Sequence, residues 1–270
     1  MAQRLVLGLI LSLCIGGMGY WRKSLSPSGV AGAVILGNAI FGFGGWAWGL
    51  LLILFFVSAS ALSHFRAGAK EPLAEKFDKG GRRDLGQALA NGGWGAVLAF
   101  ASFLWPSPLW FAAFVGAMAA VNADTWATEI GVMASRPPRL ITTWKWVPVG
   151  TSGGVSLLGT ASALAGAAFI GAFAALFACI VGACAPWTYL ILGAIGGLAG
   201  SLVDSLLGAT VQGIYYCPAC EKETERRVHR CGTATRPLHG WPPLTNDWVN
   251  FLASVAGSGI AAILALASAG

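Results

Sequence analysis

Four acidic residues of this sequence stand in or beside apolar segments rather than in its polar loops. They are Asp124 and Glu129 in NADTWATEIG, Asp204 in GSLVDSLLGATVQ and Asp247 in TNDWVN. An ionised carboxylate at membrane depth is unfavourable unless it is paired, hydrated or bound to a metal. The same motifs contribute three amides, Asn122, Asn246 and Asn250. Together these oxygen ligands suit a Mg²⁺ ion bound to phosphates better than they suit zinc or copper.

The interpretation of these acids as one catalytic site has a plain alternative. Each acid on its own could instead form an ion pair with a lysine or arginine of a loop, or cap the end of a helix. Residues four apart share one face of a helix, which pairs Asp124 with Thr128 and Thr125 with Glu129. The polar stripe that they form, about two turns long, is predicted to face the interior of a helical bundle.

A glycine-rich segment, GTSGGVS over 150–156, is predicted to open the sixth helix and to bind phosphate. Glycine lets the backbone approach a ligand closely, and a helix N-terminus presents unpaired N–H groups to an anion. The alternative is that Thr151 or Ser152 is only the N-cap of that helix. The expected phosphate and nucleotide contacts are Gly150, Thr151, Ser152, Gly153, Gly154, Lys145 of the preceding basic loop, Asn122, Thr125, Ser205 and Asn246.

A second phosphate-binding group is predicted at the start of the fourth helix, in GRRDLGQALANGG. Its members are Arg82, Arg83, Gln87 and Asn91. Gln87 and Asn91 are four residues apart and therefore point the same way from a helix. The alternative for the two arginines is that they only set the topology of the helix, by the positive-inside rule.

The six cysteines divide into two groups. Those in apolar segments, Cys14, Cys179 and Cys184, are predicted to be small packing residues. The others belong to a C-P-A-C-x8-H-x-C motif formed by Cys217, Cys220, His229 and Cys231. In a cytoplasmic loop, where disulfides are disfavoured, this motif predicts a tetrahedral Cys₃His zinc site, with His239 as a rival ligand. The alternative is a metal-free loop with reactive thiols.

The elements that must position these side chains are membrane helices. Hydrophobic residues make up 56% of the chain and charged residues only 10%, and the mean hydropathy is +0.69. Apolar stretches that can cross, or nearly cross, about 30 Å of hydrocarbon occur near 4–20, 28–43, 45–62, 88–104, 108–130, 153–182, 187–212 and 248–268. Residues 1–270 are therefore predicted to form a single integral membrane domain, an all-α polytopic bundle of about eight helices, within a range of 7–9.

Two details of this bundle follow from glycine. The chain has 38 glycines, which predict helices that pack by close backbone approach, because lipid provides no hydrophobic drive between them. Segments 28–43 and 45–62 are separated only near Gly44. They are therefore either a tight helical hairpin or one broken, re-entrant element.

The basic residues predict which loops face the cytoplasm. With eight helices, 16 of the 17 lysines and arginines fall in connections on one side, and only Arg4 stands apart. Loops 64–87, 132–149 and 213–246 are therefore predicted to be cytoplasmic, and both termini extracytoplasmic, in the cytoplasmic (inner) membrane. This topology explains the net charge of +6, so nucleic acid is discounted as a partner. Segment 5–19 is predicted to be a retained helix rather than a signal peptide, because further apolar segments follow at once.

At NADTWATEIG, GTSGGVS, GSLVDSLLGATVQ and the CPAC…HRCG…NDWVN tail, the sequence resembles the transmembrane protein 19 family over nearly the whole chain. The plant member of that family is phytyl-phosphate kinase, which converts an isoprenoid alcohol monophosphate into the diphosphate, and the family is more distantly similar to CTP-dependent phytol and dolichol kinases. The resemblance points to the polar motif positions Asn122, Asp124, Thr125, Glu129, Gly150 to Gly154, Asp204, Asn246, Asp247 and Asn250.

The residues and the resemblance together predict a membrane transferase of isoprenoid lipid metabolism. It would phosphorylate phytyl or geranylgeranyl phosphate with CTP, or another nucleoside triphosphate, at the cytoplasmic face. The expected catalytic residues are Asp124, Glu129, Asp204, Asp247 and Asn250, of which Asp124, Asp204 and Asp247 would hold Mg²⁺. The expected partners are the bilayer, the isoprenoid monophosphate and the nucleotide, and a homo-oligomer is left open.

A membrane transporter or flippase that uses buried carboxylates for ion coupling is the alternative function. It predicts acids near the bilayer midplane and inverted-repeat symmetry, neither of which the sequence shows clearly. A non-catalytic membrane scaffold, the third reading, leaves the acid cluster unexplained.

Overall fold

The computed structural model describes residues 1–65, 82–183 and 185–269 and is mostly helical in these parts. The described residues form eight α-helices and one π-helical turn. They are α1 (Ala2–Trp21), α2 (Pro27–Ala39), η1 (Ile40–Gly44), α3 (Trp46–His64), α5 (Leu85–Leu104), α6 (Pro108–Gly131), α7 (Leu157–Ile180), α8 (Thr188–Thr210) and α9 (Asn246–Ala269). This architecture confirms the predicted all-α polytopic bundle of about eight helices.

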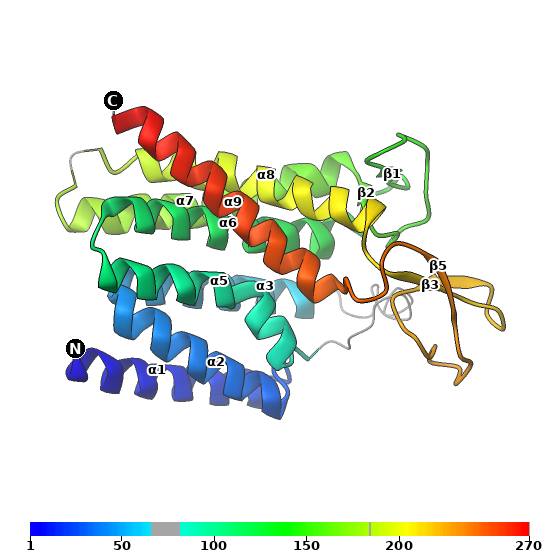
Figure 1. Ribbon diagram of the computed structural model, residues 1–270, viewed down its shortest axis with the longest axis horizontal. Coiled ribbons are helices and arrows are strands. Elements are labelled where there is room, and N and C mark those ends of the chain that lie inside the picture. Colours follow the sequence, from blue (N-terminus) through cyan, green and yellow to red (C-terminus); the bar gives the residue numbers. More distant parts are fainter. Residues whose placement is uncertain (66–81, 184, 270) are drawn as a thin grey trace.

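Successive helices run up and down along the long axis of the molecule (Figure 1). Both chain termini lie at one end of the bundle, and the strands and polar connections lie at the opposite end (Figure 1). The predicted cytoplasmic connections that the structure describes, 132–149 and 213–246, therefore share one end. Most of the third, 64–87, lies outside the described residues. Which end faces the cytoplasm stays a prediction.

Six of the described helical segments are long and apolar enough to cross a membrane: α1, α2 with η1, α3, α7, α8 and α9. Helices α5 and α6 are of similar length, 20 and 24 residues, but are not among these six segments. The reason is that α5 carries Gln87 and Asn91, and α6 carries Asn122, Asp124 and Glu129. Both helices lose hydropathy at the polar residues of the predicted site.

Helix α6 forms the centre of the bundle. Every residue from Ala112 to Ala123 is buried, and the helix packs against α3, α5, α7, α8 and α9. The packing is as close as the glycine content predicts: a Cβ added at Gly257 on α9 would lie 2.9 Å from the carbonyl oxygens of both Gly116 and Gly196. Small residues thus hold α6, α8 and α9 together in the absence of a hydrophobic drive between helices.

The region around Gly44 is a hairpin of two helices rather than one re-entrant element. Helix α2 runs into the π-helical turn η1, and the chain breaks at Gly45, whose φ of +91° is open to glycine but not to most other residues. Helix α3 begins at the next residue. Pro27–Gly44 and Trp46–His64 each have the length and hydropathy of a membrane span.

The polar connections contain short strands that the sequence did not predict. Strand β1 (Arg139–Leu140) pairs antiparallel with β2 (Gly154–Val155). A second sheet has the order β4-β3-β5, built from β3 (Ile214–Cys217), β4 (Lys222–Thr224) and β5 (Arg236–His239). These strands give the polar connections a defined geometry at the end of the bundle.

The prediction that Gly150–Ser156 opens a helix is wrong. Gly150 and Gly153 have φ values of +79° and +76°, which an α-helix does not allow, and β2 follows them. Helix α7 starts only at Leu157, where the Ser156 hydroxyl accepts a hydrogen bond of 3.0 Å from the N–H of Gly159. The N-cap is therefore Ser156, not Thr151 or Ser152.

Candidate functional site

A polar cavity of about 320 Å³ is lined by residues from helices α3, α5, α6, α7, α8 and α9 and from the connections at the strand end of the bundle. Most of the predicted site residues line it: Arg83, Gln87, Asn91, Asp124, Thr125, Glu129, Gly150, Thr151, Ser152, Gly153, Gly154, Asp204, Ser205, Asn246 and Asn250. Segments up to about 170 positions apart in the chain thus meet at one place.

Four carboxylates line this cavity, and three of them interact electrostatically. Asp124 comes from α6, Asp204 from α8 and Glu225 from the residue after β4. Asp204 is within electrostatic range of both other carboxylates. Its Oδ2 atom is buried and has no hydrogen-bond partner among the described residues. A buried carboxylate oxygen without a partner is unfavourable, so this atom fits a cation ligand.

The side chains that share the cavity with Asp204 can offer oxygen atoms as ligands to a cation. Carboxylates of Asp124 and Glu225 and the amides of Asn246 and Asn250 line the same cavity. Oxygen-only sets of this kind hold Mg²⁺, which keeps some waters and takes further oxygens from substrate phosphates. The residues present therefore fit the predicted magnesium site.

The glycine-rich segment 150–154 also lines the cavity, where it packs against α8. A Cβ added at Gly153 would clash with the Cβ of Ala209 and lie 2.6 Å from the carbonyl oxygen of Ser205, so only glycine allows this close approach to α8. The hydroxyl of Thr151 is buried and has no partner within the described part of the chain. The N–H groups of Thr151 and Gly154 already donate within the connection, to Pro148 and Thr151. The unpaired Thr151 hydroxyl is therefore the donor of this segment that best suits a phosphate ligand.

Gln212, just after α8, connects this segment to the cysteine-rich connection. Its side chain is almost fully buried, with 1% of its surface exposed. The Ser152 hydroxyl donates to its Oε1 (2.9 Å), and its Nε2 donates to Oε1 of Glu225 (2.8 Å). One amide therefore fixes both the glycine-rich segment and the third carboxylate.

Arg83 lies just before α5 and also lines the cavity. Its backbone is hydrogen-bonded to the connection between α1 and α2: its N–H donates to the Ser24 carbonyl (2.9 Å) and its carbonyl accepts from the Ser26 N–H (3.0 Å). Its guanidinium is half-buried and donates to the Ser60 hydroxyl (3.2 Å). Burial lowers the pKa of Arg83, and the nearby Glu129 carboxylate opposes this shift. Backbone and side-chain contacts thus both hold the Arg83 guanidinium beside the cavity.

Gln87 has a structural role in the first turn of α5. The Asp84 carboxylate accepts from the N–H of Gln87 (2.9 Å), and the N–H of Asp84 donates to Oε1 of Gln87 (3.2 Å), which is a capping box. Gln87 lines the cavity with its acceptor already engaged. Its Nε2 donors are the part that could reach a ligand.

The cysteine motif forms a four-residue cluster at the β3–β4 turn. One ligand atom from each of Cys217, Cys220, His229 and Cys231 lies within 4.8 Å of all the others. The Sγ atoms of Cys217 and Cys231 are 3.7 Å apart, close to the ~3.8 Å expected for two thiolates at ~2.3 Å from one tetrahedral ion. His239, the rival ligand, lies on β5 and is not part of this group. The cluster can hold a metal ion, and its geometry fits zinc.

Hydrogen bonds shift the pKa values of two thiols of this cluster in opposite directions. Contacts with Thr233 and His229 lower the pKa of Cys231 to about 6, whereas the hydrogen bond with Cys231 raises the pKa of Cys220 to about 11. The other cysteine prediction is wrong where it can be judged: Cys14 and Cys179 are exposed on the helices rather than packed, and Cys184 lies outside the described residues.

Comparison with known proteins identifies the family. Residues 10–258 match the family described as Integral membrane protein DUF92. The chain belongs to this family. This DUF92 protein is 33% identical to Protein PGR of Arabidopsis thaliana over 270 residues, 92% of each chain. It is 32% identical to Uncharacterized membrane protein MJ0933 of Methanocaldococcus jannaschii over 209 residues, 76% of this chain and 82% of that one.

A third relative matches a smaller share of both chains. Protein VTE6, chloroplastic, of Arabidopsis thaliana is 30% identical over 193 residues, 70% of this chain and 56% of that protein. No solved structure matches the chain. These findings confirm the predicted relationship to transmembrane protein 19-like proteins and confirm that the DUF92 protein is an integral membrane protein.

Four predicted residues of the DUF92 protein do not line the polar cavity among the residues that the structure describes: Arg82, Asn122, Lys145 and Asp247. Arg82 and Lys145 are exposed to solvent. Asn122 is fully buried, donates from Nδ2 to Gly166 (2.7 Å) and accepts at Oδ1 from Ser58 (2.9 Å), so it joins three helices. Asp247 occupies the first turn of α9, between helix positions that do line the cavity.

Glu225, which lines the cavity, and Gln212, which holds it, carried no recognised signal in the sequence. Glu225 stands among seven acids of polar loops, and only the β3–β4 hairpin turns it toward α8. Gln212 ends the motif GSLVDSLLGATVQ, which drew attention only for its aspartate. A polar side chain directly after a membrane helix was the available signal for Gln212.

Proposed function

We propose that this DUF92 protein is a lipid-phosphate kinase. It transfers the γ-phosphoryl group of a nucleoside triphosphate, with CTP as first candidate, to an isoprenoid monophosphate such as phytyl or geranylgeranyl phosphate. One observation carries the proposal: carboxylates, a glycine-rich segment and an arginine line a single cavity at the end of a membrane bundle. The resemblance to a family whose plant member is phytyl-phosphate kinase supports the choice of acceptor.

The acidic side of the cavity is assigned to the metal-bound nucleotide. Asp124 and Asp204, with Glu225, would hold Mg²⁺, and Asn246 and Asn250 would complete the oxygen environment. When bound, Mg²⁺ neutralises charge on the triphosphate, which is a large part of phosphoryl-transfer catalysis. The Thr151 hydroxyl and the backbone N–H groups of Ser152 and Gly153 would bind phosphate oxygens.

The basic side of the cavity is assigned to the acceptor. Arg83 would bind the phosphate of the lipid, one oxygen of which attacks the γ-phosphorus. The bond from that phosphorus to the β–γ bridging oxygen breaks, and the nucleoside diphosphate leaves. The acceptor is already an ionised phosphate, so the step needs no general base. Glu129 is therefore assigned to electrostatic support of Arg83 rather than to proton transfer.

The position of the acids favours this function over a transporter or flippase. Asp124 and Asp204 lie in the last third of α6 and α8, toward the end that carries the strands. Ion coupling by buried carboxylates calls for acids near the midplane of the membrane. A nucleotide can reach the end of the bundle from the aqueous phase, which we propose to be the cytoplasm.

The test is a turnover assay of the purified full chain in lipid nanodiscs with Mg²⁺. Phytyl, geranylgeranyl and farnesyl monophosphates are each combined with CTP, ATP, GTP and UTP, and the lipid diphosphate is measured. We expect diphosphate formation that Asp204→Asn abolishes. Absence of product for every pair, from protein that is monodisperse and cooperatively folded, would overturn the proposal.

A further inference from the structure

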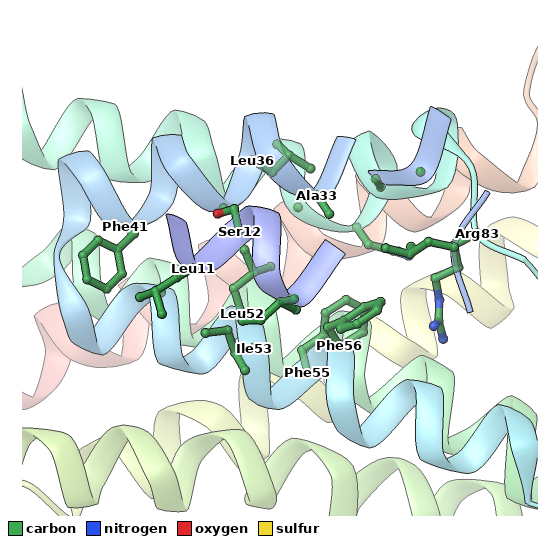
Figure 2. Close-up of a pocket in the computed structure, with 18 of the residues that line it drawn as sticks. Leu11, Ser12, Ala33, Leu36, Phe41, Leu52, Ile53, Phe55, Phe56 and Arg83 are labelled. Atoms are coloured by element: carbon green, nitrogen blue, oxygen red, sulfur yellow. The ribbon is translucent and has the colours of Figure 1, made fainter. Parts of the chain in front are cut away.

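A second cavity lies between helices α1, α2, α3 and α5, and its walls are apolar. Its larger apolar lining side chains include Leu11, Leu36, Phe41, Leu52, Ile53, Phe55 and Phe56 (Figure 2). The labelled side chains follow the helix direction, with Phe41 at one end and Arg83 at the other (Figure 2). The cavity is therefore an elongated apolar slot with a single arginine at one end.

The length and width of this slot restrict its ligand. Gly29 and Phe41, near its two ends, are twelve residues apart along α2 and η1, about 18 Å at 1.5 Å per residue. Its free volume is only about 90 Å³. A long and narrow space suits one extended hydrocarbon chain and does not suit a ring system or the paired chains of a diacyl lipid.

The apolar slot and the polar cavity meet at the start of α5. Arg83, Gln87 and Asn91 line both of them. An amphiphile that lies across this junction would keep its chain among apolar side chains and its head group among polar ones. A free phosphate or a nucleotide would use only the polar side, so the pairing of the two cavities indicates a single-chain lipid with a charged head.

Arg83 suits the head group of such a lipid. A guanidinium has five N–H donors in a planar fork and binds phosphate through two of them at once. One of these donors contacts Ser60, and the backbone of Arg83 is held by Ser24 and Ser26. The cation therefore has a defined position at the mouth of the slot.

We infer that the apolar slot holds the hydrocarbon chain of the phosphoryl acceptor, with its phosphate bound to Arg83 at the border of the polar cavity. The inference rests on the proposed function for the identity of the reaction, but it makes a separate claim about lipid binding. It places α1, α2 and α3, which contribute none of the acids, in substrate recognition.

Binding without nucleotide tests this claim apart from catalysis. Radiolabelled geranylgeranyl monophosphate and geranylgeraniol are the probes, with the purified full chain in nanodiscs. Ala33→Phe fills the slot between Arg83 and Leu36 (Figure 2) and is expected to weaken binding of both probes at least about tenfold, as when roughly two methylenes lose their contacts. Arg83→Gln is expected to weaken binding of the phosphate about tenfold or more but to leave that of the alcohol unchanged.

The matched control is Ala31→Phe, the same change two residues away at an exposed position of α2, which should bind as the parent does. Leu11→Trp, toward the Phe41 end, is a second variant in case Ala33→Phe does not fold. Leu11→Trp should weaken the binding of geranylgeranyl phosphate more than that of the shorter geranyl phosphate. Equal binding by the parent, Ala33→Phe and Leu11→Trp would overturn the inference. The expected binding pattern without any turnover would support the slot and refute the kinase.

Discussion

The side-chain amide of Gln212 donates a hydrogen bond of 2.8 Å to the carboxylate of Glu225, which lines the polar cavity within electrostatic range of Asp204. The same amide accepts from Ser152. Gln212 thereby couples the cysteine-rich connection, the glycine-rich segment and the end of α8. Its contacts lead to a prediction that does not depend on its touching substrate.

Gln212→Leu keeps a similar volume but removes both hydrogen bonds. We expect it to lower the free energy of unfolding by about 1–3 kcal/mol, since Ser152 and Glu225 lose a buried partner. We also expect a fall of about tenfold in kcat, because Glu225 is no longer held toward the cavity. Thermal unfolding and turnover of the same preparation measure the two effects. Unchanged unfolding and turnover would mean that the bridge has no role.

The effect of replacing a carboxylate should depend on whether that carboxylate lines the cavity. Asp124→Asn and Asp204→Asn keep the shape of the side chain and delete a charge, so each is expected to lower kcat about 100-fold or more. Asp247→Asn should have a smaller effect, because Asp247 does not line the cavity in the described structure. Turnover across a Mg²⁺ titration is the measurement. Near-parental rates in both Asp124→Asn and Asp204→Asn would make these acids structural.

Glu225 and Glu223 lie two residues apart, but only Glu225 lines the cavity. Glu225→Gln is expected to lower kcat at least about tenfold, whereas Glu223→Gln, on the exposed strand β4, should stay within about twofold of the parent. The two substitutions are chemically identical and two residues apart. If both variants were equally active, Glu225 would have to be removed from the site.

The cysteine cluster should bind one zinc ion per chain. Cys220→Ser removes one of four ligands and is expected to lower zinc content and the unfolding temperature together. His239→Ala, which removes a histidine outside the cluster, should leave both unchanged. Elemental analysis of the purified protein decides. A zinc content near zero in the parent, or a loss in His239→Ala alone, would contradict the assignment.

The orientation of the bundle can be read by thiol labelling in intact cells. In a background without native cysteines, a cysteine at Ser135 in the 132–149 connection should be protected from a membrane-impermeant reagent, because the basic connections are predicted to be cytoplasmic. A cysteine at Ser268, near the C-terminus, should react. The opposite labelling pattern would invert the topology.

The sequence by itself determined the helices and which of them carry chemistry. Apolar runs set the spans, and local capping chemistry set several starts, such as Ser26 before Pro27, Asp84 with Gln87, and Ser107 before Pro108. Hydropathy and capping depend on neighbours within a turn or two, so they can be read from the chain alone. The acids of α6 and α8 stood out for the same reason, as charges within apolar runs.

Only the tertiary structure decided which polar residues meet. Arg82 and Arg83 are adjacent in sequence, yet only Arg83 lines the cavity, because its backbone is hydrogen-bonded to the connection between α1 and α2. Asn122 looked like part of the site but joins three helices, while Glu225 looked like a loop acid but lines the cavity. These outcomes depend on helix packing and hairpin pairing between segments far apart in the chain. No local pattern of residue types encodes that convergence.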